Sequence, residues 1–229
     1  MNNYTRSIVA PEETTIVMAH HSEVSREPLH ADNYLAGRGY AVGQVLSRVF
    51  HPILLNVAMF LIVGYYAMAT HVEGLKWALI CIFAQVVPPS LFFSYRMRQG
   101  AYSDEDVSNR RQRNELYLFG LGTVLVGLLI LTPLGLPRPF VALLLCAFVI
   151  GIINSIVNLG WKISVHATAS ASIATVTWLF APLLGIALWL GALAVGWARV
   201  RTRNHTPLQV VSGFAVAASV VLVVFRLVG

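Results

Sequence analysis

The amino-acid sequence predicts an all-α membrane protein, a polytopic bundle of about six to seven transmembrane helices. Hydrophobic residues make up 57% of the chain and charged residues only 11%, whereas soluble domains carry roughly 25% charged residues. The apolar residues also form long runs between short polar loops, and a run of about 20 apolar residues is what a helix needs to cross a bilayer. Both observations argue against a soluble globular domain.

The basic residues point to a membrane and not to nucleic acid. The net charge is +6, but the arginines stand in short loops between apolar runs. There they set the orientation of a membrane protein and contact anionic head groups. We therefore expect a membrane lipid as the ligand and no nucleic-acid partner.

The first part of the chain is predicted to lie outside the membrane. Residues 1–39 are polar and of mixed charge, which predicts a cytosolic tail without a cleaved signal peptide. This tail is the segment by which the chain would join a membrane-protein complex. Residues 34–50 place apolar side chains at helical spacing, which indicates a short helix at the membrane interface. Residues 40–229 are expected to form the membrane domain.

Four apolar runs in the middle of the chain are long enough to span the membrane. Pro88 and Pro89 lie inside the second run and are expected to kink it, because proline donates no backbone hydrogen bond. Short connections are predicted at residues 71–74 and 132–139, and a long polar loop at residues 96–115. The spans themselves are expected at residues 52–70, 75–95, 116–131 and 140–159.

The apolar run between His166 and Arg199 decides the topology. As a single span it would put its two polar ends on opposite faces of the membrane. We predict instead a short hairpin of two helices that turns at Ala181-Pro182, because proline is favoured at a helix start. The hairpin returns both polar ends to one face, and a final span is expected to start at Pro207.

This topology places most of the basic residues on one side, together with the tail. Lys76, Arg138 and Arg226 fall on the other side. Cytoplasmic loops of membrane proteins carry an excess of Lys and Arg. The side with most of the basic residues, which also has the N-terminus and the polar loops, is therefore predicted to face the cytoplasm. The membrane would be an inner or plasma membrane.

Polar side chains gather in two segments on that side. One segment follows the fourth span and holds Lys162, Ser164 and His166, and the other follows the hairpin and holds Arg199 and His205. Arginine suits a phosphate dianion because its planar fork makes paired hydrogen bonds. Hydrolysis through a covalent phosphoenzyme needs a nucleophile and an acid that protonates the leaving oxygen. Two histidines on separate loops can divide these tasks, so the segments predict a phosphate site at the membrane face.

Three polar segments resemble the motifs of the type-2 phosphatidic acid phosphatase superfamily, membrane enzymes related to vanadium haloperoxidases. Residues 164–166, S-V-H, are similar to its S-G-H motif. Residues 199–209 are similar to its R-x-x-x-x-x-H-x-x-x-D motif, with glutamine in place of the aspartate. Residues 106–113, D-V-S-N-R-R-Q-R, resemble the D-V-x-x-R-x-x-R form of the first motif in one branch. The similarity covers roughly residues 40–220, and the predicted hairpin lies between the second and third motifs.

The resemblance implies a role for each polar residue. His205 would be the nucleophile, and His166 would protonate the leaving oxygen. Gln209 would orient His205 in place of the aspartate. The phosphate oxygens would be held by Arg110, Arg113, Ser164 and Arg199, to which we add Lys162 as a further cation. No metal and no cofactor are implied, because arginines and a histidine take the place of a metal.

Two functions from different classes fit these residues. The first is an integral-membrane phosphatase that hydrolyses a lipid phosphate or diphosphate, of the phosphatidic acid or polyprenyl type, through a phosphohistidine intermediate. The second is a catalytically inactive relative that acts as a membrane subunit or lipid-binding scaffold, because Gln209 and Val165 replace an aspartate and a glycine of the motifs. A haem or metal protein that uses His166 and His205 finds no support in ligand spacing.

Overall fold

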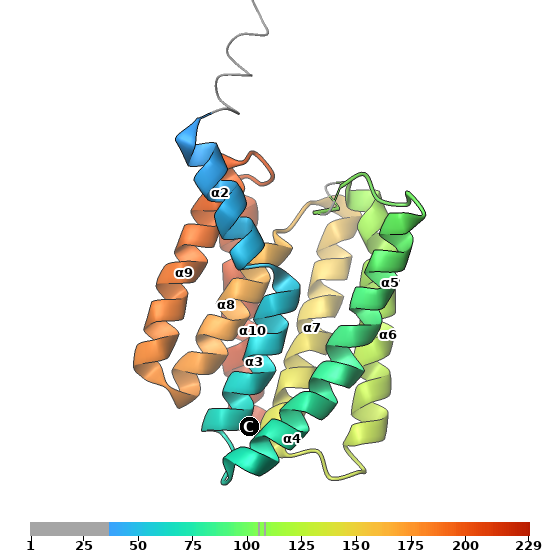
Figure 1. The fold of residues 1–229 in the computed structure, drawn as a ribbon, viewed down its shortest axis with the longest axis vertical. Coiled ribbons are helices and arrows are strands. Elements are labelled where there is room, and N and C mark those ends of the chain that lie inside the picture. The colour runs from blue at the N-terminus through green and yellow to red at the C-terminus, as the bar shows by residue number, and fades with distance from the viewer. Residues whose placement is uncertain (1–36, 105, 108) are drawn as a thin grey trace, which may run out of the picture. The chain divides into compact units, whose positions relative to one another are not determined.

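The computed structural model describes residues 37–104, 106–107 and 109–229. The tail predicted for residues 1–39 therefore lies almost wholly outside the described residues. Every regular element in the described part is a helix, and these helices belong to one unit, Arg38–Gly229 (Figure 1). The all-α bundle predicted from the sequence is confirmed.

The first two described helices meet at a bend beside His51. Helix α2 covers Arg38–Val49 and helix α3 covers Pro52–Tyr66, with an angle of 46° between them. The His51 imidazole accepts a hydrogen bond of 3.3 Å from the backbone at the start of α3 and so caps that helix. Helix α2 lies within the predicted interfacial segment and packs on helix α9, burying Gly43 and Ser47.

The second span starts earlier than the sequence predicted. Helix α4 covers His71–Cys81, so the connection predicted at residues 71–74 is wrong. Thr70 is the physical reason, because its hydroxyl accepts a hydrogen bond from the Glu73 amide at 3.3 Å and caps the helix. The connection between the spans is instead residues 67–70.

A π-helical turn lies in the second span, just before the prolines at which a kink was predicted. This turn, η1 (Ile82–Val86), joins α4 to helix α5, Val87–Arg98. Pro88 and Pro89 follow directly, and because proline lacks an N–H the regular hydrogen-bond ladder is interrupted there. The three elements together form one apolar stretch of 28 residues that is long enough to cross a membrane.

Two regular spans follow the polar loop. A 3-10 turn, η2 (Arg110–Gln112), leads into helix α6, Arg113–Leu131, and helix α7 covers Arg138–Gly160. Both helices contain the predicted apolar runs and extend into the polar residues that precede them. The polar loop is consequently shorter than predicted and covers residues 99–109.

The predicted hairpin is present. Helix α8 covers Val165–Phe180 and helix α9 covers Pro182–Arg201, so the chain turns at Ala181. The two helices approach closely because Gly185 has no side chain, and a Cβ there would overlap the backbone of Trp178. The polar residues before α8 and after α9 thereby return to one end of the bundle.

The last helix, α10 (Pro207–Val228), completes the bundle. Within the described residues, five helical stretches are long and apolar enough to cross a membrane, or six if the bent pair α2 and α3 is one span. Helix α8, with 16 residues, is not among them. The chain is an integral membrane protein, and the five or six candidate spans of the described residues lie at or just below the lower end of the predicted range of six to seven.

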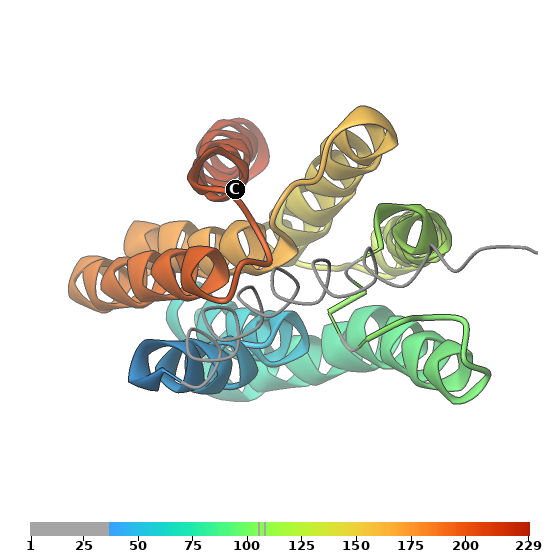
Figure 2. The same ribbon diagram turned by 90° about the horizontal axis from the view of Figure 1, so that it is seen from above.

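The polar loops all lie at the same end of the bundle. In Figure 1 the loop of residues 99–109, the segment before α8 and the loop between α9 and α10 are at the upper end, whereas the turn between α8 and α9 is at the lower end. Figure 2 looks onto the upper end. The hairpin therefore brings His166 and His205 to one end, as the predicted topology required.

Candidate active site

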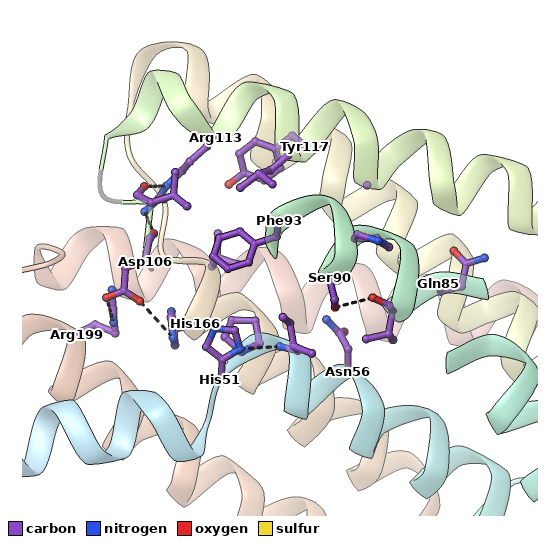
Figure 3. A pocket seen from close by; sticks show the side chains of 18 of the residues that line it. His51, Asn56, Gln85, Ser90, Phe93, Asp106, Arg113, Tyr117, His166 and Arg199 are labelled. Atoms are coloured by element: carbon purple, nitrogen blue, oxygen red, sulfur yellow. Dashed lines mark hydrogen bonds and ion pairs between the residues drawn. The ribbon is translucent and has the colours of Figure 1, made fainter. Parts of the chain in front are cut away.

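A pocket of about 380 Å³ lies at this end of the bundle. Its polar part is lined by side chains from the three polar segments of the sequence (Figure 3). These segments contribute two histidines, two arginines and a carboxylate, namely Asp106, Arg113, His166, Arg199 and His205. Segments that are far apart in the chain thus form one site.

His205 lies directly before α10 and is oriented by the cap of that helix. The Thr206 hydroxyl accepts a hydrogen bond from the Gln209 amide at 3.3 Å, and the Gln209 side-chain oxygen Oε1 accepts one from the Thr206 amide at 3.1 Å. The same Oε1 lies 3.1 Å from Nδ1 of His205. Because Oε1 can only accept, Nδ1 carries the ring proton and the lone pair is left on Nε2.

His205 is neutral in this site. Burial, together with the charges of Arg199 and Lys162, lowers the pKa of His205 from its usual 6.5 to about 3. The hydrogen bond that His205 donates to Gln209 opposes this shift in the pKa. An unprotonated imidazole is the form in which histidine acts as a nucleophile, so the ring is ready for attack at neutral pH.

The pH dependence of turnover should reflect this low pKa. Protonation removes the lone pair of His205 only in strong acid, so His205 should cause no loss of kcat/KM as the pH falls from 7 to about 5. The phosphate of a monoester substrate titrates near pH 6. We therefore expect the acid limb of the plot of kcat/KM against pH to shift when an alkyl monoester is exchanged for an aryl monoester with a different phosphate pKa. A limb fixed near pH 6.5 for both substrates would contradict a neutral His205.

His166 lies in the first turn of α8 and is supported from two sides. The Ser164 hydroxyl caps the helix by accepting the Ala167 amide at 3.4 Å. The His51 ring stands edge-on to the His166 ring, with the centroids 5.9 Å apart. Nε2 of His166 lies 3.8 Å from a carboxylate oxygen of Asp106 and has no hydrogen-bond partner among the described residues. This nitrogen is available to a group that enters the pocket.

Arg199 lies in the last turn of α9 and is almost fully buried, with 1% of its surface exposed. Its Nη1 donates to the Asp106 carboxylate at 3.0 Å and to the Ser47 hydroxyl at 3.3 Å. Its Nε has no hydrogen-bond partner within the described part of the chain. A buried guanidinium with an unused donor suits an anion that enters from the pocket.

Arg113 holds two walls of the pocket together. Its guanidinium donates to the carbonyl oxygens of Val107 at 2.7 Å, Asp106 at 3.3 Å and Ile163 at 3.2 Å. These bonds join the loop before η2 to the segment before α8. Arg113 therefore fixes the backbone around the site, and its contact with phosphate stays a prediction.

Three further residues with predicted phosphate contacts do not line the pocket. Arg110 donates to the Leu159 carbonyl at 2.7 Å, and Lys162 donates to the Asn204 carbonyl at 2.9 Å. Ser164 is fully buried and caps α8. All three fasten neighbouring segments around the site, and the structure does not bring their side chains to the pocket wall.

Some residues of the site were not singled out in the sequence. Asp106 opens the first motif but received no role, although its carboxylate contacts Arg199. Asn204 donates to the same carboxylate at 3.1 Å, and its only signal was its place next to His205. His51 lines the pocket and supports His166, and no sequence signal pointed to it.

Comparison with known protein families agrees with the resemblance seen in the motifs. Residues 116–229 match the family described as the PAP2 superfamily. The matched stretch contains His166, Arg199 and His205, and it begins just after the first-motif segment, residues 106–113. Comparison with curated proteins and with solved structures gave no match.

Proposed function

Because the chain belongs to the PAP2 superfamily through residues 116–229, we propose that it is an integral-membrane phosphatase that hydrolyses a lipid phosphate or diphosphate. Members of this superfamily are generally phosphatases. The single observation that carries the proposal is that His166, Arg199 and His205 line one pocket at one end of the bundle. A nucleophile, an acid and a phosphate-binding cation are thus available in the same place.

In the proposed reaction, Nε2 of His205 attacks the phosphorus atom. An N–P bond forms while the P–O bond to the lipid breaks, and the electron pair of that bond leaves with the lipid oxygen. His166 donates a proton to this oxygen, and the negative phosphate beside it favours the protonated imidazolium. Water then attacks the phosphorus atom of the phosphohistidine while His166 accepts its proton. A P–O bond forms, the N–P bond breaks with its electron pair returning to Nε2 of His205, and inorganic phosphate is released.

The phosphate charge would be held by Arg199 and by the start of α8. Arg199 still has its buried Nε to donate. The N-terminus of a helix favours an anion because its first backbone N–H groups point outward, and Val165 in the first turn of α8 lines the pocket. Fixed donors of this kind stabilise the charge of the transition state without having to reorganise.

The remainder of the pocket supports a lipid as the substrate. Away from the histidines its walls include apolar side chains of α3, α5 and α6, namely Ile53, Phe93 and Leu116, beside a few polar ones such as Asn56 and Gln85. An amphiphile can keep its chain among these helices while its head group reaches the site. Both a phosphatidic acid and a polyprenyl phosphate have this general form, so both belong in the test.

We also propose that the site faces the cytoplasm. Arg138 begins α7 and Arg226 lies in the last turn of α10, both at the end opposite the site, whereas Arg96, Arg98 and Arg201 end the helices that lead to it. The positive-inside rule then orients the bundle. Labelling of a cysteine introduced at position 203 by an impermeant reagent outside intact cells would contradict this orientation.

A second candidate function rests on Gln209. Its neutral amide sets the tautomer of His205, but it does not supply the negative charge that would stabilise a phosphohistidine cation. The alternative is therefore a catalytically inactive relative that binds a lipid phosphate as a membrane subunit or scaffold. The polar tail is the segment that would meet a partner in that case.

Phosphate release separates the two functions. We expect the purified protein to release phosphate from phosphatidic acid, polyprenyl phosphate or polyprenyl diphosphate, and to keep this activity in the presence of EDTA because no proposed step uses a metal. Vanadate should inhibit it, since vanadate adopts the geometry of the transition state. Binding of these lipids without release, together with co-purification in a stable complex, would instead favour the inactive relative.

A further inference from the structure

The candidate phosphate site already holds a negative group of the protein itself. The Asp106 carboxylate accepts hydrogen bonds from Nη1 of Arg199 at 3.0 Å and from Nδ2 of Asn204 at 3.1 Å. It also lies 3.8 Å from Nε2 of His166 (Figure 3). Arg199 and His166 are the groups that would hold and protonate a substrate phosphate. The carboxylate and the phosphate therefore compete for the same place.

The Asp106 carboxylate leaves some of the buried polar atoms around it without a hydrogen bond. Nε of Arg199 and Nε2 of His166 are both buried and lack a hydrogen-bond partner among the described residues. A carboxylate offers two oxygens and one charge, whereas a phosphate monoester at neutral pH offers three terminal oxygens and nearly two charges. Because an unpartnered buried polar atom is unfavourable, the monoester is the better ligand for these groups.

Asp106 can leave Arg199 without rearrangement of its loop. Arg113 fixes the backbone by donating to the carbonyl oxygens of Asp106 at 3.3 Å and Val107 at 2.7 Å. The Asp106 side chain is 30% exposed, whereas the Arg199 side chain is 2% exposed. Rotation of the Asp106 side chain toward its exposed side would thus free the guanidinium while the backbone stays in place.

We propose that Asp106 is a specificity-determining residue, whose carboxylate keeps singly charged phosphodiester head groups out of the site and is displaced by a phosphate monoester. A diester carries one charge and two free phosphate oxygens, as a carboxylate does. A diester therefore binds Arg199 little more strongly than the Asp106 carboxylate does. Once bound, it also lies beside the displaced carboxylate, which has a charge of the same sign. A monoester gains a third oxygen and a second charge. This inference rests on the proposed function and names its ligand class, terminal phosphate groups.

The test removes the charge of Asp106 and keeps its shape. In the Asp106→Asn variant, the concentration of a phosphodiester lipid, phosphatidylglycerol in mixed micelles, that halves monoester hydrolysis should fall about 10-fold or more relative to wild type. The KM for the monoester should fall or stay unchanged. Asp106→Ala should behave in the same way, because the effect belongs to the charge.

Asp104→Asn is the matched control. It makes the same change of charge in the same loop, and the Asp104 carboxylate accepts a hydrogen bond from the Ser103 hydroxyl at 2.9 Å. Its sensitivity to phosphatidylglycerol should equal that of the wild type. The proposal is overturned if Asp106→Asn is no more sensitive than this control, or if it loses monoester binding, since Asp106 would then support the ligand and not compete with it.

Direct binding keeps this test separate from the question of activity. Calorimetric titration with inorganic phosphate and with dimethyl phosphate should show that Asp106→Asn binds both more tightly than wild type, with the larger gain for the diester. If this pattern appears but neither protein hydrolyses any lipid, the proposed function fails and the inference stands. If wild type hydrolyses lipids but the pattern is missing, the inference fails and the proposed function stands.

Discussion

Replacement of His205 by alanine is expected to lower kcat for phosphate release by at least about 10³-fold, because it removes the nucleophile. His166 is not expected to take over this role, since its Nε2 lies beside Asp106 and is assigned to the leaving oxygen. Binding of the lipid phosphate should persist, because Arg199 remains in place. The measurement is the rate of phosphate release together with the affinity for the same lipid.

A histidine remote from the pocket provides the control for this result. His71 begins α4 and stacks on Tyr65, with ring centroids 4.3 Å apart, and it does not line the pocket. We expect His71→Ala to keep wild-type activity. A His205→Ala variant that retains more than about one tenth of the wild-type rate would show that another group makes the N–P bond, or that no such bond forms.

The second large effect is expected at His166, and it should depend on the leaving group. A lipid alkoxide is a poor leaving group and needs a proton, so His166→Ala should lower kcat/KM for a lipid monoester by about 10²- to 10⁴-fold. p-Nitrophenyl phosphate releases a stable phenolate that needs no proton. For that substrate the same variant should keep most of its kcat/KM, which reports the transfer of the phosphoryl group to His205 and not the later attack of water.

Comparison of the two substrates separates proton donation from structural damage. A variant whose site had merely collapsed would lose activity on both substrates to the same degree, and this result would contradict the role of His166 as an acid. His51→Ala is a useful companion, because His51 stands edge-on to the His166 ring. Because His51 acts through His166, its loss should lower kcat/KM for the lipid monoester more than for p-nitrophenyl phosphate, but by less than His166→Ala does.

The prolines and apolar runs were sufficient to predict much of the fold. Pro52, Pro182 and Pro207 each open a helix, as expected from a residue with a fixed φ and no N–H to satisfy. The prediction of the hairpin depended on Pro182 in particular. Because this hairpin sets which polar segments share a face, the common location of the two histidines was also predictable.

The ends of the helices were less predictable, because they depend on single hydrogen bonds. Thr70 caps α4 and moves its start to His71, where a connection was predicted. Charged residues extend other helices beyond their apolar runs, so that α5 continues to Arg98 and α6 begins at Arg113. At Arg98 the long side chain allows this, since its charged end reaches the membrane surface while its stem packs along the helix. At Arg113 the guanidinium is instead buried and donates to backbone carbonyl oxygens.

The contacts within the site were the least predictable feature. Motif spacing indicated that His166, Arg199 and His205 belong together, but not which atoms would meet. Asp106 reaches Arg199 across 93 positions of the chain, and only the packing of the helices determines that contact. Likewise the sequence shows that Arg113 is charged, but not that its donors bind backbone carbonyl oxygens.

The most direct measurement of the central claim traces the phosphoryl group itself. Purified protein is mixed with a lipid monoester that carries a radiolabelled phosphate and is quenched in alkali, where phosphohistidine is stable. We predict label on the peptide that contains His205, and none after replacement of His205 by alanine. Label on a different residue, or turnover of the lipid without any labelled protein under single-turnover conditions, would contradict it.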